Sequence, residues 1–277
     1  MPELPEVEHG RQVLHRIAAG RTIAAAVVAD DPIVIPDLPA DGLRDLLVGV
    51  RVTGTDRHGK QLWFDLEGRP SVLIHFGMTG GFRLPGDQPL QLETSSKRVD
   101  RSWPPRFTKL HLTFEDGGEI AFVNSRRLGR IRLRDDPRAE PPISKLGYDP
   151  LKTLPSAAAF DKRIGRRATK LKVLLLDQGF AAGVGNWIAD EVLYQARLAP
   201  HRTVDTLDAA ERDRLRLAIR RVIKTAVRVG ARKDAFPANW LFHHRWGKTD
   251  GARTKLGPIT FSEIGGRTTA WVPAVQS

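Results

Sequence analysis

The first residues of the chain combine a secondary amine with carboxylates. Pro2 follows the initiator Met, and Glu3 and Glu6 lie one helical turn apart behind it. A small second residue favours removal of Met1, so we expect the mature chain to begin at or next to residue 1, with a free amine on Pro2. An α-amino group titrates at about pH 8, and its neutral form can attack a sugar C1′ to form a Schiff base. The two glutamates are placed to move protons and stabilise charge there.

Three further segments carry residues suited to contacting phosphates or stacked bases. Lys60 lies in a tight turn between two predicted strands, Met78 in a Gly-rich loop after a strand, and Asn186 before a predicted helix. An exposed Met can wedge into stacked bases, and Asn186 at a helix N-cap with free amides forms an anion site. Each of these residues also has a purely structural explanation. The first-turn glutamates suit the helix dipole. Lys60 could be a surface lysine, Met78 a core residue and Asn186 an ordinary helix cap.

Two differently patterned halves must position these residues. In the first half, Leu4, Val7, Leu14 and Ile17 recur at helical spacing and Gly20 ends that helix. Short alternating runs separated by Gly, Asp and Pro then predict strands, which two packed antiparallel sheets would bury. The predicted strands are Ile23–Ala29, Val50–Asp56, Gln61–Asp65, Ser71–Phe76, Lys109–Phe114, Glu119–Asn124 and Arg130–Arg134.

The second half is predicted to be helical after a proline-bearing linker. Helices are expected over Lys170–Gln178 and Trp187–Ala196, followed by a longer helix with its apolar face at Leu215, Ile219 and Val222. We interpret the charged face of the longer helix as solvated. That face carries Arg212, Arg214, Arg216, Arg220 and Arg221. From about Phe236 the pattern returns to short strands.

Charge and composition narrow the class of protein. The 277 residues carry 44 Lys and Arg against 32 Asp and Glu, a formal net charge of +12. That sign favours a polyanion because neutralised phosphates release counterions, although a ribosomal partner or an acidic membrane face would be served equally. No apolar run has the length of a membrane span. The absence of Cys excludes disulfides, a thiolate nucleophile and Cys-based zinc sites, and fits an intracellular location.

Several short motifs, in order along nearly the whole chain, resemble the formamidopyrimidine-DNA glycosylase/endonuclease VIII family. The motifs are Pro2–Glu8, Gly59-Lys60, Phe76–Gly80, Leu176–Gln178 with Gly183–Asn186 and Ala189–Glu191, and Gly266–Thr269. The resemblance implies an α+β multidomain fold. It places a two-sheet antiparallel β-sandwich with a flanking helix over 1–135, a linker over 136–155, a helix–two-turns–helix domain over 156–235 and a β-hairpin finger over 236–277.

The resemblance also implies catalytic and phosphate-binding roles. Pro2 is similar to the family's Schiff-base nucleophile, and Glu3 to the proton donor and acceptor at the sugar. Glu6 is similar to a second carboxylate of the same network. Lys60 and Asn186 resemble the groups that bind phosphates on either side of a damaged nucleotide.

Four positions resemble the residues that replace a flipped base, and one resembles a phosphate ligand of the finger. Met78 is similar to the residue that fills the space left by the flipped base, and Arg126 or Arg127 to its partner facing the orphaned base. Leu128 stands where many members have an inserted Phe, and Leu cannot stack on bases. Arg267 is similar to the phosphate-binding arginine of the C-terminal finger.

The finger departs from the usual four-cysteine zinc site. Val272 and Val275 stand where the second cysteine pair would lie, and Ala252 and Lys255 roughly where the first would lie. The segment therefore resembles the zincless finger of some members, in which apolar packing holds the hairpin. We expect no metal and no cofactor.

The implied function is base-excision repair by a DNA glycosylase with AP-lyase activity. We expect the protein to act as a monomer on damaged duplex DNA inside the cell and not to bind a membrane. A catalytically silent damaged-DNA-binding protein on the same scaffold is the alternative, and an RNA- or ribosome-binding protein is supported by charge alone. The lesion stays open among oxidised purines, oxidised pyrimidines, ring-opened bases and alkyl adducts.

Overall fold

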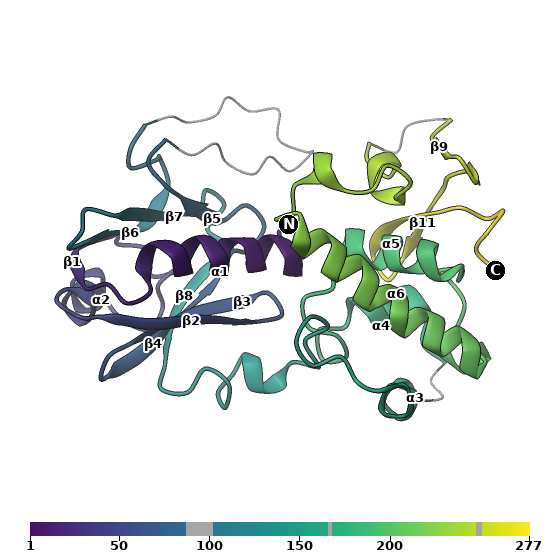
Figure 1. Cartoon of the computed structure of the whole chain (residues 1–277), viewed down its shortest axis with the longest axis horizontal. Coiled ribbons are helices and arrows are strands. Elements are labelled where there is room, and N and C mark those ends of the chain that lie inside the picture. Colours follow the sequence, from purple (N-terminus) through teal and green to yellow (C-terminus); the bar gives the residue numbers. More distant parts are fainter. Residues whose placement is uncertain (87–101, 166–167, 248–250) are drawn as a thin grey trace. The chain divides into compact units, whose positions relative to one another are not determined.

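The computed structural model describes residues 1–86, 102–165, 168–247 and 251–277, and it divides into two compact units (Figure 1). The first unit comprises Met1–Lys145 and the second Leu146–Ser277. This division falls inside the range 136–155 for which a linker is predicted; the predicted domain boundaries themselves stay a prediction. None of the helices in the described ranges combines the length and apolar composition that a membrane span requires.

The first unit contains two four-stranded sheets with helix α1 (Leu4–Ala18) packed against strands of both (Figure 1). All neighbouring strands are antiparallel. One sheet has the order β1 (Ile23–Val28), β6 (Thr108–Phe114), β7 (Glu119–Val123), β5 (Gly81–Arg83). The other has the order β2 (Val52–His58), β3 (Gln61–Leu66), β4 (Arg69–His75), β8 (Arg130–Arg134). The predicted antiparallel two-sheet architecture with a flanking helix is confirmed.

The core of the first unit follows from the alternation of its strands. Leu110, Leu112 and Phe114 of β6 are buried while the residues between them are partly exposed, as expected when one face of a strand meets a core. Helix α1 adds the apolar face that includes Val7 and Leu14. Helix α2 (Ala40–Leu47), which the sequence analysis did not assign, buries two leucines in the same core.

The second unit is helical and ends in two β-hairpins. Its helices are α3 (Ala157–Ile164), α4 (Leu171–Leu176), α5 (Asn186–Ala196) and α6 (Ala209–Arg228), with short turns η2 (Val204–Thr206), η3 (Lys233–Ala235) and η4 (Leu241–His244). One hairpin pairs β9 (Arg253–Thr254) with β10 (Gly257–Pro258), and the other pairs β11 (Thr260–Ile264) with β12 (Arg267–Trp271). Helix α5 packs against α4, α6, η4 and β12, which makes it the centre of the unit.

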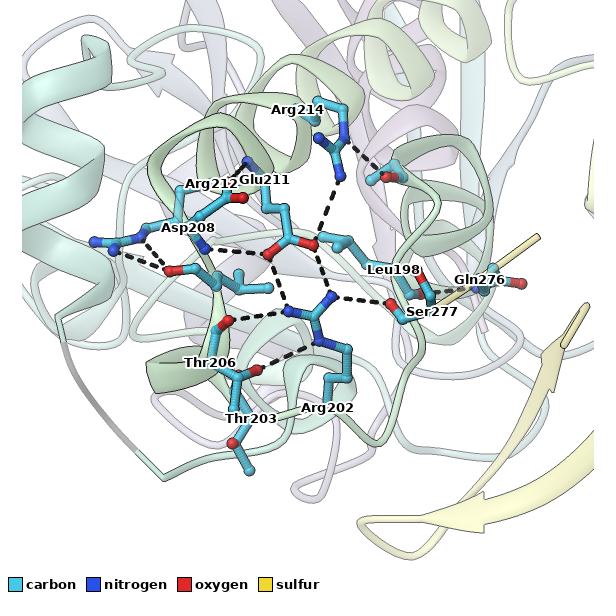
Figure 2. A network of polar contacts seen from close by, with 12 residues as sticks. Leu198, Arg202, Thr203, Thr206, Asp208, Glu211, Arg212, Arg214, Gln276 and Ser277 are labelled. Atoms are coloured by element: carbon cyan, nitrogen blue, oxygen red, sulfur yellow. Dashed lines mark hydrogen bonds and ion pairs between the residues drawn. The ribbon is translucent and has the colours of Figure 1, made fainter. Parts of the chain in front are cut away.

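A polar network fixes the start of α6 (Figure 2). Asp208 accepts a hydrogen bond from the Glu211 N–H at 2.7 Å, and the Glu211 carboxylate accepts one from the Asp208 N–H at 3.1 Å. This reciprocal capping box satisfies donors that the helix start leaves unpaired. Arg202 donates to both Glu211 carboxylate oxygens, at 2.7 and 2.9 Å, and to the Ser277 carbonyl at 3.0 Å. The residues after the last hairpin are thereby tied to α6.

The arginines of α6 form only part of the solvated face that the sequence pattern predicts. Arg214, Arg220 and Arg221 are exposed, although Arg221 also donates to the Gln195 side chain of α5 at 2.8 Å. Arg212 instead pairs with Asp161 of α3, and its side chain is 21% exposed. Arg216 pairs with Asp213 at 2.8 Å and is 16% exposed. The prediction was wrong for Arg212 and Arg216, because a helical charge pattern does not reveal the partners that neighbouring elements bring.

Candidate functional site

The start of α1 brings the proline and the two candidate carboxylates together. Pro2 directly precedes Glu3, which is the N-cap of α1, and Glu6 occupies the third position of the helix. The Glu6 carboxylate accepts a hydrogen bond from the Glu3 N–H at 2.9 Å, as in a capping box. Glu3 is 3% exposed and Glu6 is 8% exposed. Two carboxylates therefore share a desolvated corner beside the proline.

Burial changes the acidity of this corner. Burial and the neighbouring charge of Glu3 raise the pKa of Glu6 to about 7, although hydrogen bonds from the backbone oppose the shift. A carboxyl group with this pKa is protonated in a large fraction of molecules at neutral pH. It can therefore give a proton to, or take one from, a reacting group.

A buried ion pair joins α1 to the turn that carries Lys60. Burial alone would raise the pKa of Glu8, but hydrogen bonds and charge from Arg11 and Arg57 lower it to about 2. The Arg57 side chain is fully buried and lies 3.0 Å from Glu8, and it also donates to the Gly59 carbonyl at 2.9 Å. Gly59 has φ +58, which suits the two-residue turn between β2 and β3. The position of Lys60 is thus fixed relative to the start of α1.

His75 stays neutral next to this turn. It pairs with Gln61 across β3 and β4, and its Nδ1 accepts a hydrogen bond from the Gly77 N–H at 3.2 Å. Burial lowers the pKa of His75 to about 4, and the charges of Lys60, Arg130 and Arg132 act in the same direction. The end of β4 therefore adds no positive charge of its own.

Two loops at the ends of β4 and β7 are joined by one buried amide. Asn124, which has no exposed surface, donates to the Phe76 carbonyl at 2.9 Å and accepts from the Gly129 N–H at 3.0 Å. Gly77 has φ +64, and a Cβ there would lie 2.4 Å from the carbonyl carbon of Leu128. The glycine therefore allows the loops of residues 75–80 and 124–129 to touch through their backbones.

The two joined loops present apolar side chains to the surface. Met78 is 37% exposed and Leu128 is 44% exposed. The hydroxyl groups of Thr79 and Ser125 lie 3.3 Å apart and add a second link between the loops. The site thus holds two exposed apolar residues on a closely packed backbone.

The adjacent arginines differ in their partners. Arg127 makes two hydrogen bonds of 2.9 Å to Asp31, a carboxylate that also pairs with Lys109 at 2.7 Å. The hydrogen bonds from Arg127 and Lys109 hold the pKa of Asp31 well below its usual range. Arg126 is exposed and, among the residues that the structure describes, has no hydrogen-bond or ion-pair partner. Arg126 is therefore available to a ligand, whereas Arg127 is held in place.

Asn186 and Arg267 belong to the second unit and are joined through one strand. Asn186 is the first residue of α5, and the N-cap is Gly185, so the predicted N-cap position of Asn186 was wrong. Its side chain instead donates to the Thr268 carbonyl of β12 at 2.9 Å, directly after Arg267. The Asn186 Oδ1 is buried without a hydrogen-bond partner in the described part of the chain, and Arg267 is exposed.

A buried charge cluster holds this strand against α5. Asp190, which is 1% exposed, pairs with Lys172 of α4 and with Arg245, whose Nη2 lies 2.6 Å away. The same carboxylate accepts a hydrogen bond from the Ala270 N–H of β12 at 3.1 Å. Lys172 also donates to the Asn186 carbonyl at 2.9 Å. Asp190 thus holds α5, which carries Asn186, against β12, which carries Arg267.

The residues of the last two hairpins do not fit a zinc ion. The chain has no Cys, and the described residues contain no group of three or more His, Asp or Glu able to hold a metal. At the position predicted for the second cysteine pair, Val272 belongs to a buried apolar cluster with Tyr194, Leu241 and Ala270. Gln276 accepts from the Val272 N–H at 2.7 Å and donates to the Leu198 carbonyl at 2.9 Å. Apolar packing and hydrogen bonds therefore hold this segment.

The structure places the candidate residues in two groups, one in each unit. Asn186 and Arg267 form the group of the second unit. In the first unit, α1 and the β2–β3 turn link the set of Pro2, Glu3, Glu6 and Lys60. The positions 78 and 126–128 lie on the joined loops of the same unit. The sequence analysis missed the residues that hold these groups together: Arg57, Asp31, Asn124, Asp190 and Arg245. Asn124 and Asp190 fell inside a quoted strand or motif, but the sequence does not show their contacts with Phe76, Arg245 and Ala270, which lie 48 to 80 residues away.

Comparison with known proteins gives the family. The model of the formamidopyrimidine-DNA glycosylase N-terminal domain matches residues 1–131, and that of the formamidopyrimidine-DNA glycosylase H2TH domain matches residues 146–236. A formamidopyrimidine-DNA glycosylase of Arabidopsis thaliana is 37% identical over 276 residues, which cover 100% of this chain and 71% of that protein.

Two solved structures agree with this match. The crystal structure of the MutM (Fpg) protein from Thermus thermophilus has a TM-score of 0.77 and 34% identity, covering 99% of this chain and 98% of that one. A variant of the Lactococcus lactis enzyme, in complex with Fapy-dG containing DNA, has a TM-score of 0.80 and 25% identity, covering 99% of each chain. The sequence and fold together establish that the chain belongs to the formamidopyrimidine-DNA glycosylase family.

Proposed function

We propose that this chain is a bifunctional enzyme that excises a damaged base and then nicks the strand, with Pro2 as the nucleophile. As a member of its family it is a DNA glycosylase of base-excision repair; the AP-lyase activity and the residue roles are the proposal. The observation that carries the proposal is the buried corner of Glu3 and Glu6 directly behind Pro2, in which the pKa of Glu6 is raised to about 7.

The chemistry begins after Met1 is removed. The lone pair of the Pro2 nitrogen attacks C1′ of the damaged nucleotide, and the bond from C1′ to the base breaks. The departing base takes up a proton, and the sugar ring opens as Glu3 protonates its oxygen, which leaves an iminium ion between Pro2 and C1′. Loss of a proton from C2′ then eliminates the 3′ phosphate, and a further elimination releases the 5′ phosphate. Glu6 shares a proton with Glu3 during these steps.

Binding precedes chemistry because a glycosidic carbon cannot be reached inside a base stack. Lys60 in the first unit and Asn186 and Arg267 in the second bind phosphates of the damaged strand. Met78 fills the space that the flipped nucleotide leaves, and Leu128 wedges beside it. Arg126 faces the orphaned base, because Arg127 is already occupied by Asp31.

The names of the relatives support a proposal for the substrate class. The enzymes that match are named formamidopyrimidine-DNA glycosylases, and one solved relative holds Fapy-dG containing DNA. We propose that ring-opened purines in duplex DNA are the substrate of this chain, and that it acts as a monomer inside the cell. Kinetics on a panel of lesion duplexes, each paired with all four opposite bases, would rank the lesions.

Trapping with borohydride tests the nucleophile. Sodium borohydride reduces an iminium ion to a stable amine and so links the enzyme covalently to an abasic-site duplex. We expect a form with an uncleaved N-terminal extension to lose the covalent product, because its Pro2 nitrogen is an amide and cannot attack C1′. Pro5→Ala, a change one helical turn away, should retain it. Trapping that survives in the extended form contradicts the proposal.

A nicking assay separates the enzyme from a catalytically silent damaged-DNA-binding protein on the same scaffold. The enzyme should convert an abasic-site duplex to nicked strands, and Glu3→Gln should bind the duplex while losing most of the nicking activity. A wild-type protein that binds the duplex but leaves it intact supports the silent alternative.

A further inference from the structure

A cavity in the second unit lies outside the residues to which the proposed function gives a role. Its volume is about 940 Å³. Its walls come from α5, α6, residues 237–240, the end of η4, β9 and the turn after it; α5, α6 and β9 are labelled in Figure 1. Neither Asn186 nor Arg267 lines it.

Five of the lining side chains are cationic. The cations are Arg197, Arg221, Arg228, Arg253 and Lys255, and all five are exposed. Of the lining residues that the structure describes, Glu191 alone is a carboxylate. The concave surface therefore concentrates a positive field, which low-dielectric walls strengthen.

The single carboxylate carries only part of its negative charge at neutral pH. One Glu191 oxygen accepts a hydrogen bond from the Gln195 side chain at 2.7 Å, and the other accepts from the Phe242 N–H at 2.9 Å. Glu191 has no exposed surface, and this burial raises its pKa to about 7. The carboxylate is therefore a poor counter-ion for the exposed cations.

Most of the cations lack an acidic partner inside the protein. In the described ranges, Arg228, Arg253 and Lys255 have no ion pair or side-chain hydrogen bond. Arg221 donates only to the neutral side chain of Gln195, and Arg197 lies 5.6 Å from the Tyr194 ring. Arginines elsewhere in the unit, such as those of α6 paired with Asp161 and Asp213, do have such partners. The cations of the cavity are therefore available to an anionic ligand.

The remaining lining mixes polar and apolar residues, and its apolar part suits a flat organic group. Tyr194 and Trp240 are each 5% exposed, Leu256 is 41% exposed, and Pro237 adjoins them. A cavity of this size falls within the range of about 300–1,000 Å³ that is typical of small-molecule sites. A ligand with an apolar ring and several negative charges would match both parts of the lining.

We propose that this cavity binds a nucleotide, with its phosphates on Arg228, Arg253 and Lys255 and its base against Tyr194 and Leu256. The nucleotide is either free in solution or an unpaired unit of a nucleic-acid strand. Lys255 stands roughly where the usual zinc finger of the family would have a cysteine of its first pair. The hairpin of this chain therefore contributes a cation to the cavity at that position.

The test uses the full-length protein and two probes, adenosine 5′-triphosphate and a ten-nucleotide thymidine strand. Affinities are compared for the wild type, for Arg253→Ala with Lys255→Ala, and for Lys224→Ala with Arg232→Ala. The last pair removes the same charge from exposed residues that do not line the cavity. Irradiation with 8-azidoadenosine 5′-triphosphate, followed by mass spectrometry of the labelled peptides, locates the bound nucleotide independently of affinity.

We expect the cavity variant to weaken binding of at least one probe by tenfold or more, and the control variant to weaken it less than twofold. Labelling should fall on residues 191–197 or 237–256. Loss of triphosphate binding identifies a free nucleotide as the source, and loss of strand binding alone identifies an unpaired unit. Equal weakening by the two variants, labelling elsewhere, or no binding of either probe at low ionic strength would overturn the proposal. None of these outcomes depends on glycosylase or lyase activity.

Discussion

Replacing Asp190 with Asn tests the buried charge cluster that supports Asn186 and Arg267, the proposed phosphate-binding residues of the second unit. The side chains of Lys172 and Asp190 have no exposed surface, and that of Arg245 is 5% exposed. Asp190→Asn keeps the shape of the side chain but leaves two buried cations without their counter-ion. Breaking a buried pair by removing one partner costs about 3–5 kcal/mol, because the remaining charge stays desolvated.

The effect should appear both as lost stability and as lost DNA binding. For a unit of this size, a cost of about 3–5 kcal/mol lowers the midpoint of thermal unfolding by on the order of 10 °C. Asp190 also accepts from the Ala270 N–H, so β12 loses an anchor close to Arg267. Below the unfolding temperature, we expect weaker binding to an abasic-site duplex and a shallower dependence of log affinity on log salt, because a phosphate contact is lost.

Matched variants make the result interpretable. Asp213→Asn removes an ion pair whose carboxylate is 42% exposed, and it should cost less than about 1 kcal/mol. Replacing Lys172, Asp190 and Arg245 together by apolar residues of similar volume should recover much of the stability but not the DNA affinity. Calorimetry and fluorescence anisotropy measure the two quantities. If Asp190→Asn unfolds at the same temperature as Asp213→Asn, the cluster does not hold the unit as described.

Three further predictions concern the first unit and the finger. Because folding raises the pKa of Glu6 from 4.5 to about 7, the folded state binds the proton more tightly, and the Glu6 contribution to stability should fall by about 3 kcal/mol as pH rises from about 4.5 to 7. Denaturant titrations should show this contribution as a change with pH in the difference between wild type and Glu6→Gln, because the contributions of Glu191 and His75 are common to both proteins. Arg126→Ala should change the opposite-base preference while the free energy of unfolding stays within about 0.5 kcal/mol of the wild type. Arg127→Ala should destabilise the fold, because it leaves Asp31 with one fewer partner. Equal losses of stability in the two variants would contradict this distinction. Incubation with a chelator should leave activity and the unfolding temperature unchanged, and a loss of either that zinc restores would show a metal site.

The architecture of the first unit was predictable because its residues follow simple periods. The helical spacing of Leu4, Val7 and Leu14 predicts α1, and the alternation in β6 predicts a half-buried strand. Helix α2 was not assigned, because it has eight residues and only two buried leucines, and Gly42 lowers its intrinsic helix propensity. Short elements of this kind depend on the core that they cover more than on their own sequence.

The sequence predicts a set of candidate positions for the site but not the contacts that hold them. The proline and glutamates lie within six residues, so local sequence places them on one helix end. The contacts between Asp31 and Arg127, Glu8 and Arg57, or Asp190 and Arg245 join segments 49 to 96 residues apart. No local pattern predicts which of the 44 cationic residues each carboxylate meets, because tertiary packing decides the pairing.

Asn186 shows how a correct position can have a different local role. Its place beside a Gly-rich turn predicts an N-cap, since Asn favours that position. In the structure Gly185 is the N-cap, and the Asn186 amide joins α5 to β12. The hydrogen bond to a strand 82 residues away outweighs the local preference.

The most direct measurement is the mass of the N-terminal peptide after the enzyme has been trapped with borohydride on an abasic-site duplex and digested with protease and nuclease. If the ring nitrogen of Pro2 forms the covalent intermediate, that peptide lacks Met1 and carries the mass of a reduced sugar fragment on its first residue. An unmodified N-terminal peptide, with the sugar fragment on Lys60 or another lysine, would contradict the central claim.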